Sequence, residues 1–309
     1  TRNSFLCLFS WQGFVCSHYA MNVLTTKVRA QILTILVEGM GINAACRVTG
    51  VSKNTVLKLL ADVGSACAAY QDRVMRNLPC KRVQCDEIWA FVGMKQKNVP
   101  AALKDVFGIG DVYTWTSIDA DTKLIPAWLV GTRTAKCAKL FVSDLASRLA
   151  NRVQLTTDGY KPYLNAVDDA FGAEIDYAML VKIYGTPTGN KTERRYSPGD
   201  CCSAIKGTVT GNPEEGHIST SFVERANLTM RMHMRRFTRL TNAFSKKVEN
   251  HAHAVALNFM FYNFCKIHLS LRVTPAMEAK ISDHVWSMEE VVMMADTMPK
   301  KVVTENIST

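Results

Sequence analysis

The sequence predicts a mixed α/β protein, in which a β-sheet is flanked by helices and preceded by a helical segment. Apolar residues recur at helical spacing between residues 28 and 63, as expected for amphipathic helices. After residue 80, strand-like and helical runs follow one another in the order β, β, β, α, β, α, β, insertion, α, which is typical of a mixed sheet covered by helices. The 309 residues leave room for more than one folding unit.

The segment 21–75 has the pattern of a helix-turn-helix DNA-binding domain. Helices are expected over 28–38 and 43–48, Gly50 allows a left-handed turn, and Ser52 can cap a third helix. A helical hairpin without DNA contact is the alternative interpretation of this pattern. In the DNA-binding interpretation, the exposed face of the third helix presents these side chains to DNA: Lys53, Asn54, Thr55 and Lys58.

The region from residue 80 to 272 is predicted to form the sheet and the helices that cover it. Residues 186–216 lack a sustained period and are interpreted as a loop insertion, and residues 273–309 as a C-terminal tail. The elements expected in order are strands over 82–93, 112–119 and 123–130, a helix over 134–150, a strand over 153–157, a helix over 160–171, a strand over 175–183, and helices over 220–240 and 245–267.

Charge and composition favour a polyanionic partner. The chain has 37 Lys and Arg against 27 Asp and Glu, a net charge of +10. Seven basic residues and no acid lie between residues 225 and 247, and from this run we expect Arg235, Arg236 and Arg239 to contact DNA. A solvated helix face is the alternative interpretation of this run.

The remaining composition indicates a soluble cytoplasmic protein associated with the nucleoid. After residue 20, no stretch reaches the roughly 18 uninterrupted apolar residues of a membrane helix. Residues 1–20 are interpreted as an upstream or non-native leader. The ten cysteines include no Cys-x-x-Cys pair, so neither a zinc ribbon nor a disulfide framework is indicated. Adjacent Cys201 and Cys202 with His217 are a weaker candidate for a metal site.

Three acids stand out for chemistry. Asp86 and Asp158 end strand-like runs, and Glu224 is the only acid in a basic helical stretch, seven residues before Arg231. Carboxylates that meet at one sheet edge need cations, and Mg²⁺ prefers oxygen ligands. Two such ions can promote displacement at phosphorus. A heptad step keeps Arg231 on the face of Glu224, where it can hold a phosphate. The alternative for Glu224 is an ordinary acid near a helix N-terminus.

Two further acids compete with this set. Glu87 follows Asp86 directly, so on an alternating strand it points to the opposite face and only one of the two enters the site. Asp119 lies at the hairpin, where Asp favours turns.

The ordered motifs resemble the DDE transposases of bacterial insertion sequences, most closely the insertion-sequence-one family. The resemblance spans about residues 80–272. It is carried by Asp86-Glu87-Ile88-Trp89-Ala90-Phe91-Val92-Gly93, by Thr157-Asp158-Gly159-Tyr160, and by Glu224-Arg225-Ala226-Asn227-Leu228 through Arg231.

This resemblance implies an RNase H-like core, cleavage of transposon ends that depends on Mg²⁺ or Mn²⁺, and joining of the 3′ hydroxyl to target DNA. The catalytic acids would be Asp86, Asp158 and Glu224. Transposition generally requires that two transposon ends be brought together, so the resemblance also implies a homo-oligomer bound to double-stranded DNA. Many relatives begin with a zinc-binding cysteine cluster, which is missing here, so end recognition falls to residues 28–63. A metal-dependent DNA nuclease without strand transfer and a non-enzymatic DNA-binding regulator are the alternatives.

Overall fold

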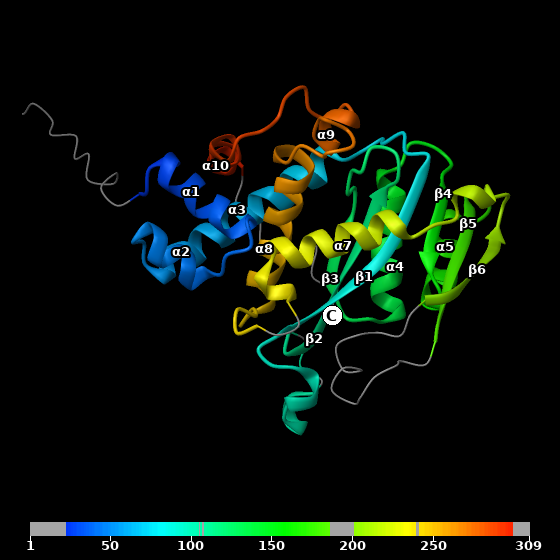
Figure 1. Cartoon of the computed structure of the whole chain (residues 1–309), viewed down its shortest axis with the longest axis horizontal. Helices are drawn as coiled ribbons and strands as arrows, with labels where there is room; N and C mark the ends of the chain where they lie inside the picture. The colour runs from blue at the N-terminus through cyan, green and yellow to red at the C-terminus, as the bar shows by residue number, and fades with distance from the viewer. Residues whose placement is uncertain (1–22, 105, 107, 186–200, 239–240, 299–309) are drawn as a thin grey trace, which may run out of the picture.

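The computed structural model describes residues 23–104, 106, 108–185, 201–238 and 241–298. The leader expected over 1–20 and Arg239 lie outside these residues. Six strands form one sheet in the order β3-β2-β1-β4-β5-β6 (Figure 1). They are β1 (Arg82–Val92), β2 (Gly110–Asp119), β3 (Trp128–Gly131), β4 (Gln154–Asp158), β5 (Asp176–Tyr184) and β6 (Cys201–Thr210).

The sheet is mixed. Strand β1 pairs parallel with β4 and antiparallel with β2, and β4 pairs parallel with β5. The outer strands β3 and β6 are both antiparallel to their neighbours. The helices are α1 (Thr26–Val37), α2 (Ile42–Thr49), α3 (Lys53–Val74), α4 (Ala135–Arg148), α5 (Pro162–Phe171), α7 (Ser221–His233), α8 (Val248–Met260), α9 (Pro275–Glu278) and α10 (Met288–Thr297).

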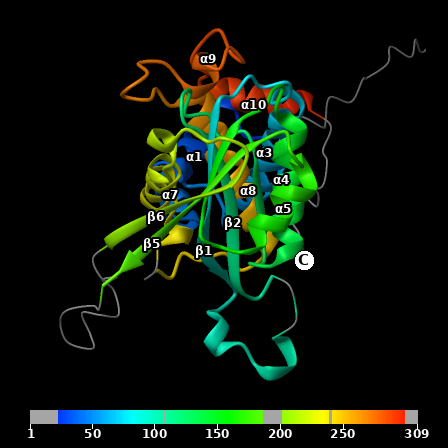
Figure 2. The ribbon, with the colours of Figure 1, turned by 90° about the vertical axis from the view of Figure 1, so that its right-hand side faces the viewer.

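Helices cover both faces of the sheet, as the sequence predicts for a mixed α/β protein. Figure 2 shows α4 and α5 on one side of the strands and α7 on the other. The apolar faces of α4 and α5 bury Phe141 and Tyr163 against Trp115 of β2. On the other face, the buried Gln84 of β1 accepts the N–H groups of Phe222 and Val223 at 2.9 and 3.2 Å. These are free donors at a helix N-terminus, so β1 itself fixes the start of α7.

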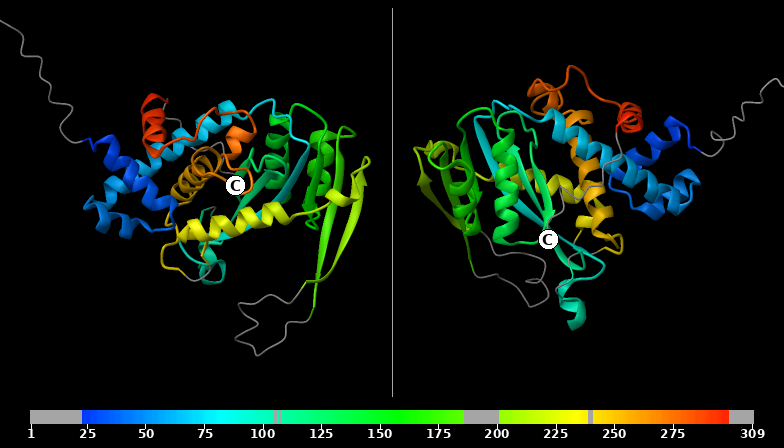
Figure 3. Two further views of the ribbon diagram at one scale, coloured as in Figure 1. Left: turned by 45° about the horizontal axis from the view of Figure 1, so that its top comes forward. Right: turned by 180° about the vertical axis from the view of Figure 1, so that it is seen from behind.

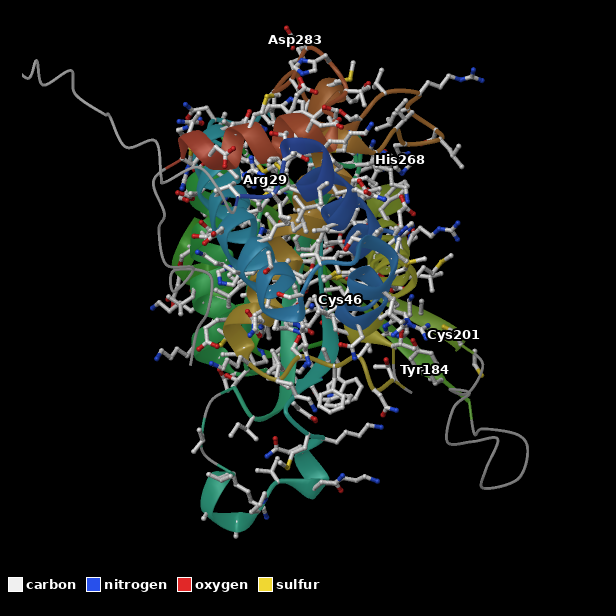
Figure 4. The ribbon with its side chains drawn as sticks, turned by 90° about the vertical axis from the view of Figure 1, so that its left-hand side faces the viewer. Arg29, Cys46, Tyr184, Cys201, His268 and Asp283 are labelled. Carbon is white, nitrogen blue, oxygen red and sulfur yellow. The ribbon has the colours of Figure 1, made fainter. Side chains whose placement is uncertain are left out.

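The N-terminal helices pack on the C-terminal ones. Helix α3 crosses α8 so closely that a Cβ on Gly64 would lie 2.5 Å from the carbonyl oxygen of His253. The side chain of Gln71 donates to the carbonyl of Ala256 at 3.1 Å. Arg29, labelled in Figure 4, binds Asp296 of α10. Figure 3 shows these helices gathered at one side of the sheet, and one cluster of buried apolar residues runs from them into the sheet.

The three N-terminal helices form where the sequence predicts them. Gly50 ends α2 at a φ of 70°, a conformation that glycine adopts without strain. The Ser52 hydroxyl accepts the N–H of Thr55 at 3.3 Å and caps α3. One face of the first two turns of α3 is exposed and carries Lys53, Asn54, Thr55 and Lys58, while Val56 points into the core. Whether this face binds DNA stays a prediction.

The loop interpretation of 186–216 is wrong for its second half, because residues 201–210 form β6. This strand pairs antiparallel with β5, for example Ile205 with Val181. Most of its side chains are exposed. Without a buried face, its sequence has no reason to alternate between apolar and polar residues, which is why the period was missing.

Two of the predicted elements are shorter in the structure than the sequence suggests. The strand expected over 123–130 pairs only as Trp128–Gly131, because the N–H of Ile125 is taken by the side chain of Asn263 at 3.0 Å. The helix expected over 220–240 ends at His233. Met234 is extended there, and both Met234 and Phe237 turn into the core.

The last predicted helix, over 245–267, is α-helical only for Val248–Met260 and ends in a π-helical segment, Phe261–Cys265. The predicted C-terminal tail contains α9 and α10. The Ser287–Glu290 capping box starts α10. None of the helices in the described ranges is both long and apolar enough to cross a bilayer.

Candidate active site

Parallel pairing of β1 and β4 brings two of the predicted acids together. Cys85 lies opposite Thr157 in the register, so Asp86 and Asp158 follow neighbouring positions on adjacent strands. Asp86, Glu87 and Asp158 each place an oxygen within 4.8 Å of the others. Within the described ranges, this is the one group of three or more acidic, His or Cys residues with such spacing. We call it the acid cluster.

Asp86 is held from two sides. Its Oδ1 accepts the N–H of Glu87 and its Oδ2 accepts the side-chain amide of Asn227, both at 2.8 Å. Burial, and then the negative charge of Asp158, raise the pKa of Asp86 to about 6, although the two hydrogen bonds lower it. The side-chain carbonyl oxygen of Asn227, Oδ1, is buried without a hydrogen-bond partner.

Glu87 corrects the expectation that only one of the adjacent acids enters the site. Its side chain is 2% exposed and its Oε2 lies 3.3 Å from Arg133. The buried Tyr163 hydroxyl interacts with the Glu87 carboxylate and opposes the rise of its pKa. Both acids meet here because Asp86 bends back to the N–H of Glu87 instead of standing away from the strand. Burial, and then Asp158, raise the pKa of Glu87 to about 7.

Asp158 ends β4 and is partly exposed. Its Oδ1 accepts the N–H of Tyr160 at 3.0 Å, and its Oδ2 lies 3.6 Å from Arg133. Burial raises its pKa, and the hydrogen bond and Arg133 oppose that shift. The cluster thus carries more negative charge than the hydrogen bonds and the single Arg133 guanidinium around it compensate.

Glu224 lies outside the acid cluster but lines the same cavity, which has a volume of about 610 Å³. Both of its oxygens lie 2.5 Å from Nζ of Lys182 on β5, and the Thr220 hydroxyl donates to Oε1 at 2.6 Å. Asn227 and Arg231 line the cavity from the same helix. The heptad spacing therefore places Glu224 and Arg231 on one face of α7, as the sequence predicts.

Sequence reasoning missed two cations of this cavity. Arg133 follows β3, and its guanidinium lies 4.1 Å from the centre of the Tyr160 ring. The Tyr160 hydroxyl donates to the Arg133 carbonyl at 2.8 Å. Lys182 directly follows the apolar run 177–181 of β5 and lies two positions after Leu180, and this placement was the available signal. Arg133 belongs to no pattern, so its role depends on the fold alone.

The other predicted residues lie elsewhere. Arg235 is exposed, whereas the Arg236 guanidinium donates to the Ser245 hydroxyl and the Asn250 carbonyl, both at 2.8 Å. Asp119 shapes the turn after β2 and accepts the Thr122 hydroxyl at 2.6 Å. Cys201 and Cys202 are exposed. Figure 4 shows Cys201 beside Tyr184, its register partner on β5.

Comparisons with known proteins show distant structural likeness and no family match. No protein-family model matches the chain, and no curated protein matches it. Among solved structures, the piggyBac transposase synaptic complex with hairpin DNA, determined by cryo-EM, aligns with a TM-score of 0.40. The sequences are 10% identical, and the alignment covers 87% of this chain and 69% of that one. At this distance, no residue role transfers from one chain to the other.

The acid cluster fits a divalent cation on its own chemistry. It offers carboxylate oxygens from three side chains within 4.8 Å, and hard cations such as Mg²⁺ and Mn²⁺ bind such oxygens. Burial and the charge of Asp158 raise the pKa of Asp86 to about 6 and that of Glu87 to about 7. A bound cation would offset this repulsion between the carboxylates.

Proposed function

We propose that this cavity cleaves DNA with the help of divalent cations, and that the protein is a DDE-type transposase with an RNase H-like core. The observation that carries the proposal is the convergence of acids from three separate segments. Asp86 and Asp158 come from adjacent parallel strands, and Glu224 faces the same cavity from the helix that follows the insertion. The strand order and the sequence motifs that resemble insertion-sequence transposases support the same reading.

Each side chain has a defined task in this proposal. Asp86, Asp158 and Glu224 hold Mg²⁺ or Mn²⁺, with Glu87 as an additional oxygen donor. The bound ions supply Lewis acidity for attack on a phosphodiester. Asn227 fixes the orientation of Asp86 through its amide, as partners behind metal ligands commonly do. Arg231 holds the phosphate whose charge increases in the transition state.

The DNA is bound by surfaces outside the cavity. The exposed face of the first two turns of α3 presents Lys53, Asn54, Thr55 and Lys58 to the element's ends. Arg235 is exposed beyond α7 and suits a phosphate contact. The net charge of +10 favours such a polyanion. Two ends must be processed together, so a homo-oligomer on double-stranded DNA belongs to this proposal.

The reaction is tested by incubating the full-length protein with DNA that carries the inverted repeats bracketing the gene. Cleavage in Mg²⁺ or Mn²⁺, and joining of a pre-cut 3′ end to a second DNA, are expected for the native protein. Asp158→Asn is expected to abolish both while DNA binding persists. Substantial cleavage by Asp158→Asn contradicts the assigned site. Cleavage without joining of a pre-cut end instead identifies a nuclease on the same core.

Two basic residues separate chemistry from binding. Arg231→Ala is expected to slow single-turnover cleavage at saturating DNA, because Arg231 lies in the cavity. Arg235→Ala is expected to weaken binding and to reduce its salt dependence by about one unit of slope, as for one lost phosphate contact. If Arg231→Ala keeps its full saturated rate, Arg231 is only a backbone contact.

A further inference from the structure

Two basic side chains hold the acids of the cavity. Arg133 Nη2 lies 3.3 Å from Glu87 and 3.6 Å from Asp158. Lys182 Nζ lies 2.5 Å from both oxygens of Glu224. These cations therefore take positions next to the oxygens that would bind a metal.

The two cations come from opposite parts of the cavity and have room to move. Arg133 lies between β3 and α4, and Lys182 belongs to β5. Their side chains are 40% and 27% exposed, so their charged ends reach the open cavity. The Arg133 guanidinium also stacks on the Tyr160 ring at 4.1 Å, which keeps this charge at the wall of the cavity when its ion pair changes.

A divalent cation and these side chains cannot share the same carboxylates at low cost. Like charges a few ångströms apart repel strongly in a partly buried site, so a metal on Asp158 or Glu224 drives Arg133 or Lys182 away. Bound DNA offers phosphate oxygens as new partners, and Arg and Lys both bind phosphate well.

We propose that Arg133 and Lys182 are exchange cations: they hold the carboxylates in the DNA-free protein and pass to DNA phosphates when divalent cations take the carboxylates. The inference rests on the proposed metal site and extends it. Metal binding and DNA binding then favour each other. Metal on the carboxylates frees Arg133 and Lys182 for phosphates, and phosphates that bind these cations free the carboxylates for metal. By linkage, DNA then raises metal affinity by the same factor as metal raises DNA affinity.

Metal binding without DNA gives the first test. Mn²⁺ binding to the full-length protein is measured by electron paramagnetic resonance. Arg133→Gln and Lys182→Gln are each expected to tighten Mn²⁺ binding by about three- to tenfold, because a competing charge is gone. Arg133→Lys and Lys182→Arg keep the charge and are expected to bind Mn²⁺ like the native protein.

Control variants remove similar cations outside the cavity. Lys206→Gln changes an exposed lysine on β6, whose Nζ donates to the carbonyl of Glu215 at 2.8 Å. Lys139→Gln breaks an exposed ion pair with Asp169 on the surface. Both are expected to leave Mn²⁺ affinity unchanged. Thermal unfolding of every variant shows that the fold is intact.

DNA binding gives the second test. In the native protein, the salt dependence of DNA affinity is expected to be steeper in Ca²⁺ than in EDTA by about two units of slope, one for each cation that passes to a phosphate. The double variant with Arg133→Gln and Lys182→Gln is expected to lose this increment.

The outcomes separate the inference from the site it rests on. If the native protein binds Mn²⁺, Asp158→Asn abolishes that binding, and the two Gln variants bind no tighter than native, then the exchange is wrong and the metal site stands. If the native protein binds no Mn²⁺ at the cluster, both the metal site and the exchange are overturned. An equal salt slope in Ca²⁺ and EDTA also overturns the exchange.

Discussion

Two groups of acids lie along β1 and differ in how completely they are bonded. Asp119 and Asp121 sit at the turn beside the start of β1. Asp119 accepts two backbone N–H groups and the Thr122 hydroxyl, and Asp121 pairs with Arg82. The acid cluster lies further along β1, where three carboxylates lie within 4.8 Å of one another and Arg133 pairs with two of them.

The difference lies in how the negative charge is compensated. The Arg82 guanidinium lowers the pKa of Asp121, whereas burial raises the pKa of Asp86, of Glu87 and also of Asp119. Only in the acid cluster does repulsion by Asp158 add to this rise, and carboxylates that repel one another in a cavity offer oxygens that a cation can bind. The same contrast distinguishes the internally bonded Arg236 from the exposed Arg235.

Replacing one acid from each group should give the largest contrast. Asp86→Asn is expected to lower the cleavage rate by on the order of 10³-fold, because a metal ligand is lost. Asp119→Asn is expected to lower stability, since it weakens the turn, and to change the cleavage rate by less than about tenfold. Single-turnover cleavage and thermal unfolding of both variants check this. If Asp119→Asn lost as much cleavage activity as Asp86→Asn, the distinction between turn-forming acids and catalytic acids would be wrong.

The support behind Asp86 should matter next. Asn227→Leu removes the amide that orients Asp86, and we expect Mn²⁺ affinity to fall by about 10- to 100-fold. Thr229→Val on the same helix removes only a bond to the Arg225 carbonyl and should leave Mn²⁺ affinity unchanged. Equal Mn²⁺ binding by native protein and Asn227→Leu would show that Asp86 needs no such partner.

The pH dependence of stability should have opposite signs for Glu87 and Asp121. Glu87 has a raised pKa, so the folded protein binds more protons and its unfolding free energy falls as pH rises from about 4.5 to about 7. In metal-free protein, Glu87→Gln should therefore gain stability relative to native over this window, by on the order of 1–3 kcal/mol.

Asp121 gives the matching control for that experiment. Its pKa is lowered, so its contribution to stability is present at neutral pH and is lost as pH falls through its folded pKa. Asp121→Asn should be less stable than native at neutral pH and approach it in acid. Chemical denaturation between about pH 2 and pH 8 measures both variants, because the contribution of Asp121 is lost only below its unfolded pKa. The same sign of change in the two would refute the comparison.

The two neighbouring arginines should give the smallest effects on DNA. Arg236→Ala is expected to lower the unfolding temperature because it removes two internal hydrogen bonds. Arg235→Ala should leave stability unchanged and weaken DNA binding by about 1 kcal/mol or less. Calorimetry and binding at two salt concentrations compare them. A stable Arg236→Ala protein with weakened DNA binding would assign Arg236 to the DNA surface instead.

Local sequence determined much of the fold. Apolar spacing, Gly50 and Ser52 were enough to place α1, α2 and the start of α3, because these signals act within a few residues. Runs of β-branched and aromatic residues placed β1, β4 and β5 to within a few residues. An acid on the first predicted strand and one at the end of the fourth were enough to predict that Asp86 and Asp158 meet. The expected strand-end position is wrong for Asp86, because β1 continues to Val92 beyond its pairing with β4.

Only the tertiary structure decided which partners those acids have. Glu87 meets Arg133 and Glu224 meets Lys182 across more than 40 positions of sequence, and no periodicity encodes such pairs. The same holds for β6, which is a strand because β5 offers an open edge, and for the end of α7, where Phe237 enters the core. Local patterns specify elements, whereas burial and charge compensation depend on residues that folding alone brings together.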